Sequence, residues 1–169
     1  MTTVGWNGGL ALRPTDCRAA RLTTIAAIVG VTAFIAILDG LLFRQHLSAL
    51  YIQVFTSPLL ARIPITIMQT VVEETLFRLI LMTAFVTLQK FLFGKVSPAS
   101  FVVAILLSQF VYVATFVIAD PVYATLRYWA VGCVWGWLYW RHGWLAALVG
   151  HTCTHLVLDP LLFLILLHS

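Results

Sequence analysis

Charged residues are scarce in this 169-residue sequence. Only 9% of its residues are Asp, Glu, Lys or Arg, against about 25% in ordinary soluble domains. Hydrophobic residues make up 62%, and the mean hydropathy is +1.00. A soluble fold of this size has no interior large enough for such an apolar fraction, and a disordered chain needs far more polar residues. These values predict a protein whose solvent is the lipid bilayer.

The sequence also lacks a cysteine framework and a basic cluster. Its three cysteines are an odd number without CxxC spacing, so no disulfide framework is expected. The ten Lys and Arg residues, which give a net charge of +4, are scattered singly along the chain. This distribution predicts no nucleic-acid partner. Single basic residues between apolar runs instead indicate how the chain is oriented in a bilayer.

Long apolar runs alternate with short polar segments. Most runs match a hydrocarbon core of about 30 Å, but residues 63–93 exceed it and must tilt, kink or leave the bilayer at one end. Residues 44–62 are interrupted by Arg, Gln, Ser and Pro, and predict an interfacial or re-entrant segment. The expected fold is all-α, a polytopic membrane helical bundle of about five transmembrane helices. The runs cover residues 22–43, 63–93, 99–119, 122–140 and 144–167.

The basic residues predict a topology. Most of them fall on one side of the membrane if the N-terminus is cytoplasmic, and the opposite side then keeps Arg44, Arg62 and Arg127. We therefore expect a multi-pass protein of the cell membrane. Its expected parts are a cytoplasmic tail (1–21) and a single membrane domain (22–169), which contains a four-helix core (63–167).

Two adjacent carboxylates and an arginine, Glu73, Glu74 and Arg78, interrupt the second apolar run. Each charge costs several kcal/mol at the bilayer centre unless it is paired or hydrated, so ionisable residues at this depth indicate function. Glu74 and Arg78 are four residues apart, and we expect an ion pair between them. Glu73 points about a quarter turn away and has no expected partner in its own helix. It is the candidate general base or acid.

The last run carries a polar stripe. His151, His155 and Asp159 are spaced by four residues, which places them on one face of an otherwise apolar helix. Counted from the ends of their runs, His151 and Glu73 both lie near mid-bilayer. The histidines are therefore candidate partners of the acidic pair, and Asp159 is a candidate supporting residue. Because a proline follows Asp159, this carboxylate could instead cap or terminate the helix.

These motifs resemble the CPBP family of intramembrane endopeptidases, which includes CAAX proteases, bacteriocin-processing enzymes and Abi-type proteins. The resemblance implies a glutamate-dependent protease without a cofactor, in which Glu73 and a histidine activate water and Glu74 and Arg78 support them. The family's last motif has histidine and then asparagine four residues later, at the positions of His151 and His155. The rest of the likeness is a glycine-rich, aromatic helix before the last span, with Gly132, Trp135, Gly136 and Tyr139.

One family histidine is missing. The family's middle motif has phenylalanine and then histidine four residues later, whereas here Phe110 is followed by Ala114 and Phe116 by Asp120. The departure leaves three readings open. His155 takes over from the missing histidine, the chain catalyses a different reaction, or it is an inactive relative.

Three alternatives to a metal-free protease remain. Glu73, His151 and His155 could bind zinc in a metal-dependent membrane hydrolase, with an open position for water. The same groups could transfer an acyl group or modify an isoprenoid. The chain could also be a non-enzymatic immunity or partner protein. For the leading hypothesis, the expected partners are the lipid bilayer and a membrane-embedded peptide or lipid-modified substrate.

Overall fold

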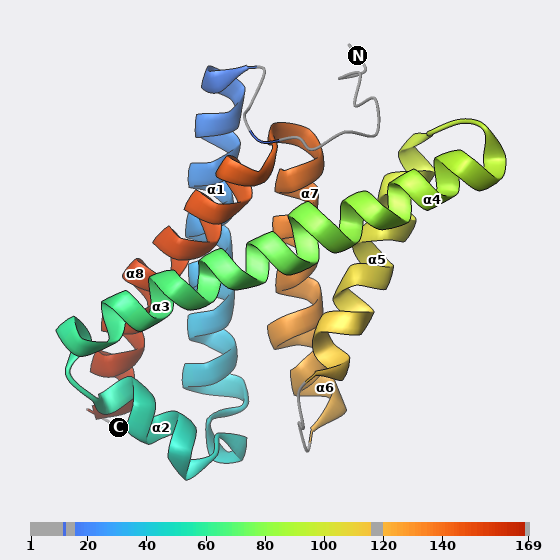
Figure 1. Ribbon diagram of the computed structural model, residues 1–169. Coiled ribbons are helices and arrows are strands. Elements are labelled where there is room, and N and C mark those ends of the chain that lie inside the picture. Colours follow the sequence, from blue (N-terminus) through green and yellow to red (C-terminus); the bar gives the residue numbers. More distant parts are fainter. Residues whose placement is uncertain (1–11, 13–15, 116–119, 168–169) are drawn as a thin grey trace.

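The computed structural model describes residue 12, residues 16–115 and residues 120–167. Within these residues the chain forms helices and contains no strand (Figure 1). The prediction of an all-α membrane bundle is confirmed. The helices in chain order are α1 (Cys17–Ile37), η1 (Leu38–Leu42), η2 (Arg44–His46), α2 (Ala49–Thr56), α3 (Leu59–Glu73), η3 (Glu74–Met82), α4 (Thr83–Phe93), α5 (Pro98–Ala114), α6 (Pro121–Ala124), η4 (Thr125–Ala130), α7 (Val131–His142) and α8 (Trp144–Leu167).

In the described part of the chain, three helices are long and apolar enough to cross a membrane. They comprise Cys17–Leu42, Leu60–Phe93 and Trp144–Leu167, with 26, 34 and 24 residues. The predicted run 99–119 corresponds to α5, an apolar helix that is shorter than these three, and residues 116–119 lie outside the described part. The run 122–140 corresponds to the successive helices α6, η4 and α7. Residues 44–62, for which an interfacial or re-entrant segment was predicted, form the short helices η2 and α2 and the first turn of α3.

Helix α1 begins earlier than the apolar pattern indicated. It starts at Cys17, five residues before Leu22, because the Asp16 carboxylate accepts hydrogen bonds from the N–H groups of Arg18 and Ala19. A side-chain cap of this kind satisfies donors that the first turn leaves open. The last residues of the predicted tail, 17–21, are therefore helical. Residues 1–11 and 13–15 lie outside the described part.

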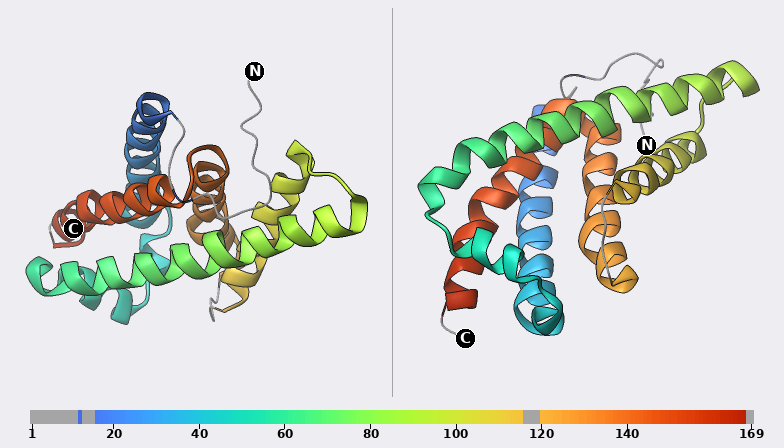
Figure 2. Two further views of the ribbon diagram at one scale, coloured as in Figure 1. Left: turned by 45° about the horizontal axis from the view of Figure 1, so that its top comes forward. Right: turned by 60° about the horizontal axis from the view of Figure 1, so that its bottom comes forward.

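The long second helix sets the architecture. Leu60–Phe93 is continuous, and its 34 residues extend over about 50 Å at 1.5 Å per residue. It runs obliquely across one side of the bundle, as two further views also show (Figures 1 and 2). Its first part, α3, packs against α8, and its middle part, η3, contacts α5, α7 and α8. The residues of η3 therefore lie where four helices meet.

Three stretches of the described chain are π-helical, and each carries a buried ionisable residue. Asp39 lies in η1, Glu74 and Arg78 lie in η3, and Arg127 lies in η4. A π-helical turn contains extra residues and is frequent at functional sites. It also changes which residues share a face, so a constant rotation of 100° per residue does not describe these stretches.

Asp39 and Arg127 form a buried polar cluster together with Tyr51 and Tyr123. The Asp39 carboxylate accepts from Arg127 Nε at 3.0 Å, from Tyr123 Oη at 3.0 Å and from Tyr51 Oη. Tyr51 belongs to the short helix α2, and burial raises the pKa of its phenol, which stays protonated and donates. Arg127 was counted in the sequence among the charges that indicate topology. In the structure it is buried and forms an ion pair with Asp39 inside the bundle.

Candidate active site

A cavity of about 440 Å³ lies between α2, α3, α5, η4 and α8. Four predicted site residues line it: Glu73, His151, His155 and Asp159. The structure therefore brings the acidic residue of the second run and the polar stripe of the last run to one space. Further polar lining comes from Tyr51, Arg62, Gln69, Tyr112, Arg127 and Tyr128.

Glu73 is the last residue of α3, and its side chain is buried at the cavity. Its Oε1 accepts a hydrogen bond from Gln69 Nε2 at 2.8 Å, and its Oε2 accepts one from Tyr112 Oη at 3.0 Å. The expectation that Glu73 has no partner in its own helix is wrong, because Gln69 lies one turn earlier. Both donors are neutral, however, so neither one compensates the negative charge.

Glu74 points away from the cavity into the bundle and is fully buried. Its Oε2 lies 3.5 Å from Arg78 Nε, which confirms the predicted ion pair, and its Oε1 lies 2.9 Å from His151 Nδ1. His151 thus pairs with the second glutamate and not with the first. Because an ionised carboxylate only accepts, Nδ1 of His151 carries the proton in this bond.

Packing between α7 and α8 fixes the plane of the His151 ring. The ring stacks on Trp135, with centroids 5.5 Å apart and an interplanar angle of 15°. This contact needs a glycine just before His151, because a Cβ on Gly150 would lie 3.1 Å from side-chain atoms of Trp135 and Leu138. Small residues before the histidine therefore allow α8 to approach α7 closely.

The close approach of α7 to η3 holds Arg78. Arg78 Nη2 donates to the carbonyl oxygen of Gly132 at 3.2 Å, and a Cβ on Gly132 would collide with the Gln109 side chain. Beside the cavity, a 2.8 Å hydrogen bond between the hydroxyl groups of Thr70 and Thr152 joins α3 to α8. These contacts keep Glu73 and His151 on facing sides of the same space.

His155 has a carboxylate partner of its own. Its Nδ1 lies 3.4 Å from Asp159 Oδ1, and Asp159 Oδ2 forms a 2.6 Å ion pair with Arg62 Nη2. The alternative that Asp159 terminates the helix is wrong, since α8 continues through Pro160 to Leu167. Arg62, expected among the topology signals, is buried here. The ring centroids of His155 and His151 are 5.2 Å apart.

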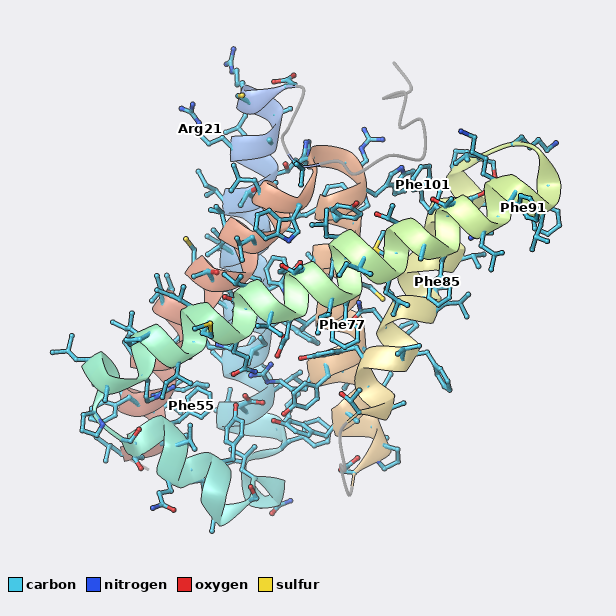
Figure 3. The ribbon with its side chains drawn as sticks, in the orientation of Figure 1. Arg21, Phe55, Phe77, Phe85, Phe91 and Phe101 are labelled. Atoms are coloured by element: carbon cyan, nitrogen blue, oxygen red, sulfur yellow. The ribbon has the colours of Figure 1, made fainter. Side chains whose placement is uncertain are left out.

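Three of the polar lining residues that the sequence pattern missed bond directly to predicted site residues: Gln69, Tyr112 and Arg62. Gln69 was detectable, because it precedes Glu73 by four residues and shares its helix face. Nothing in the sequence around Tyr112 distinguishes it from an aromatic residue that only packs in the bundle. Its ring packs edge-on against Phe77, labelled on the long helix in Figure 3, with centroids 4.9 Å apart. Asp120, by contrast, lies outside the cavity and caps α6.

The zinc alternative depends on how Glu73, His151 and His155 are arranged as possible metal ligands. Within the described part of the chain, no group of three or more His, Cys, Asp or Glu side chains is arranged to hold a metal ion. Glu73, His151 and His155 line one cavity without forming such a group. The Nδ1 atoms of both histidines bond to carboxylates, which leaves one ring nitrogen, Nε2, on each for chemistry in the cavity.

Comparison with known proteins identifies the family. The family model for the type II CAAX prenyl endopeptidase Rce1-like proteins matches residues 55–157, more than half of the chain. The chain belongs to the Rce1-like family. The match covers the acidic pair, Arg78 and both histidines, and ends two residues before Asp159. No curated protein and no solved structure matches the chain.

Membership in the Rce1-like family confirms the resemblance carried by the acidic pair and the late histidine. The Rce1-like proteins are a family of membrane proteases, so the cavity lies in a protease scaffold. Helix α5 carries Phe110 and Ala114, one of the two residue pairs compared above with the family's middle motif, and Tyr112 lies between them. In this Rce1-like chain, a phenol from that helix contacts the first glutamate directly.

Proposed function

We propose that this protein is an intramembrane glutamate-type endopeptidase of the cell membrane, which hydrolyses peptide bonds of membrane-embedded or lipid-modified substrates. The observation that carries the proposal is the setting of Glu73. Its carboxylate lines a cavity shared with two histidines, and the hydrogen bonds that it receives from the described residues come from neutral donors. The Rce1-like family supports the same class of reaction.

Charge pairing favours Glu73 as the base. Two carboxylates line the cavity, and Asp159 is neutralised by Arg62 at 2.6 Å. Among the residues that the structure describes, no cation lies at hydrogen-bond distance from Glu73, and each of its oxygens keeps a further lone pair. A carboxylate in this state accepts a proton from a water molecule more readily than one that is held in an ion pair.

The proposed reaction begins with water in the cavity. Glu73 takes one proton from the water while the water oxygen bonds to the scissile carbonyl carbon. The lone pair of His151 Nε2 accepts a hydrogen bond from the same water and so orients it. The tetrahedral intermediate then breaks its C–N bond. The electron pair goes to nitrogen, which receives the proton that Glu73 took from the water and leaves as an amine, so that Glu73 is again a carboxylate. The other product is a carboxylic acid, which ionises in solvent.

The reaction class is tested with the purified protein in lipid vesicles containing a set of membrane-anchored peptides. In water enriched in ¹⁸O, peptide hydrolysis places one ¹⁸O atom in the new C-terminal carboxylate, which mass spectrometry detects. Acyl transfer gives a lipid-linked product without ¹⁸O, and isoprenoid chemistry leaves the peptides whole. Either result would contradict the proposal. Loss of cleavage in a chelator and its recovery with zinc would favour the metal-dependent alternative.

Tyr112→Phe tests how Glu73 is held. The change removes one hydrogen bond to a carboxylate, a bond that contributes about 1.5–3 kcal/mol, and we expect kcat to fall by about ten- to a hundredfold with little change in KM. Tyr139→Phe is the matched control, because it removes a buried phenol that bonds to Thr83 outside the cavity. Equal kcat values for the Tyr112 variant and the wild type would show that this bond does not support catalysis.

A further inference from the structure

Two chains of polar contacts end at the cavity: the first runs from Arg78 through Glu74 to His151, and the second begins at Arg62. Arg62 pairs with Asp159 at 2.6 Å, and Asp159 lies 3.4 Å from His155 Nδ1. This order of arginine, carboxylate and imidazole is the same as that of Arg78, Glu74 and His151. The chain of Arg62, Asp159 and His155 is called here the Arg62 relay. The Rce1-like match ends before Asp159.

Arg62 is held firmly by its surroundings. Its Nη1 donates to the carbonyl oxygen of Phe55 at 3.2 Å, and its guanidinium lies 4.5 Å from the centroid of the Phe55 ring. Phe55, labelled in Figure 3, lies where α2 approaches the start of α3. Arg62 therefore fixes the position of Asp159 from the side of α2 and α3, although Asp159 itself belongs to α8.

The contact with Asp159 determines which ring nitrogen of His155 carries the proton. Asp159 is ionised in its pair with Arg62, and an ionised carboxylate only accepts hydrogen bonds. Nδ1 of His155 therefore donates, and in the neutral ring Nε2 has a lone pair and no proton. A neutral imidazole in this form cannot donate from Nε2 to an oxyanion, as an asparagine amide could. It can accept a proton.

Exposure distinguishes the two histidines. The His155 side chain is 24% exposed, against 11% for His151, whose ring is also stacked on Trp135. Both rings line the cavity, and His155 is the less tightly packed of the two. Of the two imidazoles, His155 is the better placed to reach a departing group.

We propose that His155 carries a proton from Glu73 to the leaving nitrogen, and that Arg62 and Asp159 are positioning residues for this transfer. The inference rests on the proposed peptidase function. Glu73, protonated by the attacking water, passes this proton to His155 Nε2. Asp159 stabilises the imidazolium through Nδ1–H. As the C–N bond breaks, Nε2 gives the proton to nitrogen, and both Glu73 and His155 return to their starting states.

The first test replaces His155 by Asn and compares two anchored substrates of the same sequence, one with a scissile amide and one with a nitrophenyl ester. An amine leaves only when protonated, whereas a nitrophenolate leaves without a proton. We expect His155→Asn to lower kcat by about a hundredfold for the amide and only a few-fold for the ester. Undiminished amide hydrolysis would show that hydrogen-bond donation suffices and would overturn the proposal.

The second test is a double-mutant cycle between Asp159→Asn and His155→Asn. If Asp159 acts through His155, Asp159→Asn slows amide hydrolysis about tenfold in the wild type and has no further effect in the His155→Asn background. An equal loss in both backgrounds would assign Asp159 a purely structural role and overturn the relay. Arg62→Lys, which keeps the cation, should retain more amide hydrolysis than Arg62→Gln.

Glu73→Gln separates the two proposals. If that variant still hydrolyses the amide, the proposed peptidase mechanism fails and the relay fails with it. If Glu73→Gln loses hydrolysis while His155→Asn keeps it, only the relay fails. Thermal unfolding of every variant in the same vesicles shows whether a loss of rate reflects a loss of fold.

Discussion

Glu73→Gln should lower kcat for peptide hydrolysis by about a thousandfold, because general-base catalysis contributes about 10²–10⁴-fold and an amide cannot accept the proton of water. Of the two described carboxylates that line the cavity, the variant removes the one that is not in an ion pair with an arginine. Each histidine keeps a basic Nε2, but in the proposed mechanism His151 orients the water and His155 passes the proton on, so neither takes the first proton in place of Glu73. Cleavage of an anchored peptide in vesicles, followed by mass spectrometry, measures the effect.

The fold should survive this change. A glutamine side chain has the same shape as glutamate and can exchange hydrogen bonds with Gln69 and Tyr112, and it removes a charge from an apolar bundle. The matched control is Asp120→Asn, the same carboxylate-to-amide change at a helix cap outside the cavity. Asn caps a helix about as well as Asp, so this control should keep full activity. Comparable activity of the two variants would rule out Glu73 as the base.

Asp39→Ala should lower the free energy of unfolding by about 3–5 kcal/mol, the usual cost of breaking a buried ion pair. Asp39 has no exposed surface and accepts from Arg127, Tyr51 and Tyr123. Its loss leaves the Arg127 guanidinium without a counter-ion inside an apolar bundle. Equilibrium unfolding in mixed detergent micelles, at fixed protein and detergent concentrations, measures the change.

The double variant Asp39→Ala with Arg127→Met tests the cause. Removing both charges also removes the uncompensated guanidinium, and buried ion pairs replaced by apolar residues often lose little stability. We expect the double variant to be more stable than Asp39→Ala alone. Two results would show that the ion pair of Asp39 and Arg127 does not hold η1 against η4. One is a free energy of unfolding for Asp39→Ala equal to that of the wild type, and the other is a double variant that is less stable than Asp39→Ala.

Much of the fold was predictable because the bilayer imposes simple constraints. Apolar run length predicts helices, since every backbone N–H and C=O group in lipid needs a partner within its own segment. Helix ends were less predictable. Asp16 starts α1 five residues before the apolar run, and the capping bond depends on a single side chain that hydropathy does not detect.

The site was predictable in its parts. Glu73, Glu74 and Arg78 stood out because charge is rare in this chain, and His151, His155 and Asp159 stood out because of their spacing. Pairing was harder to predict. Arg62 and Arg127 resemble interfacial charges in the sequence, and their carboxylate partners, Asp159 and Asp39, are 97 and 88 residues away along the chain. Only helix packing reveals such pairs.

The sequence by itself determined that this is a helical membrane protein with ionisable residues in its interior, because composition and spacing are local properties. The tertiary structure decided which charges neutralise each other. In the structure His151 bonds to Glu74, and Asp159 bonds to both His155 and Arg62. Glu73 instead accepts hydrogen bonds from neutral donors. The physical reason is that pairing depends on distances across helices, which π-helical turns and close glycine contacts adjust by a few ångströms.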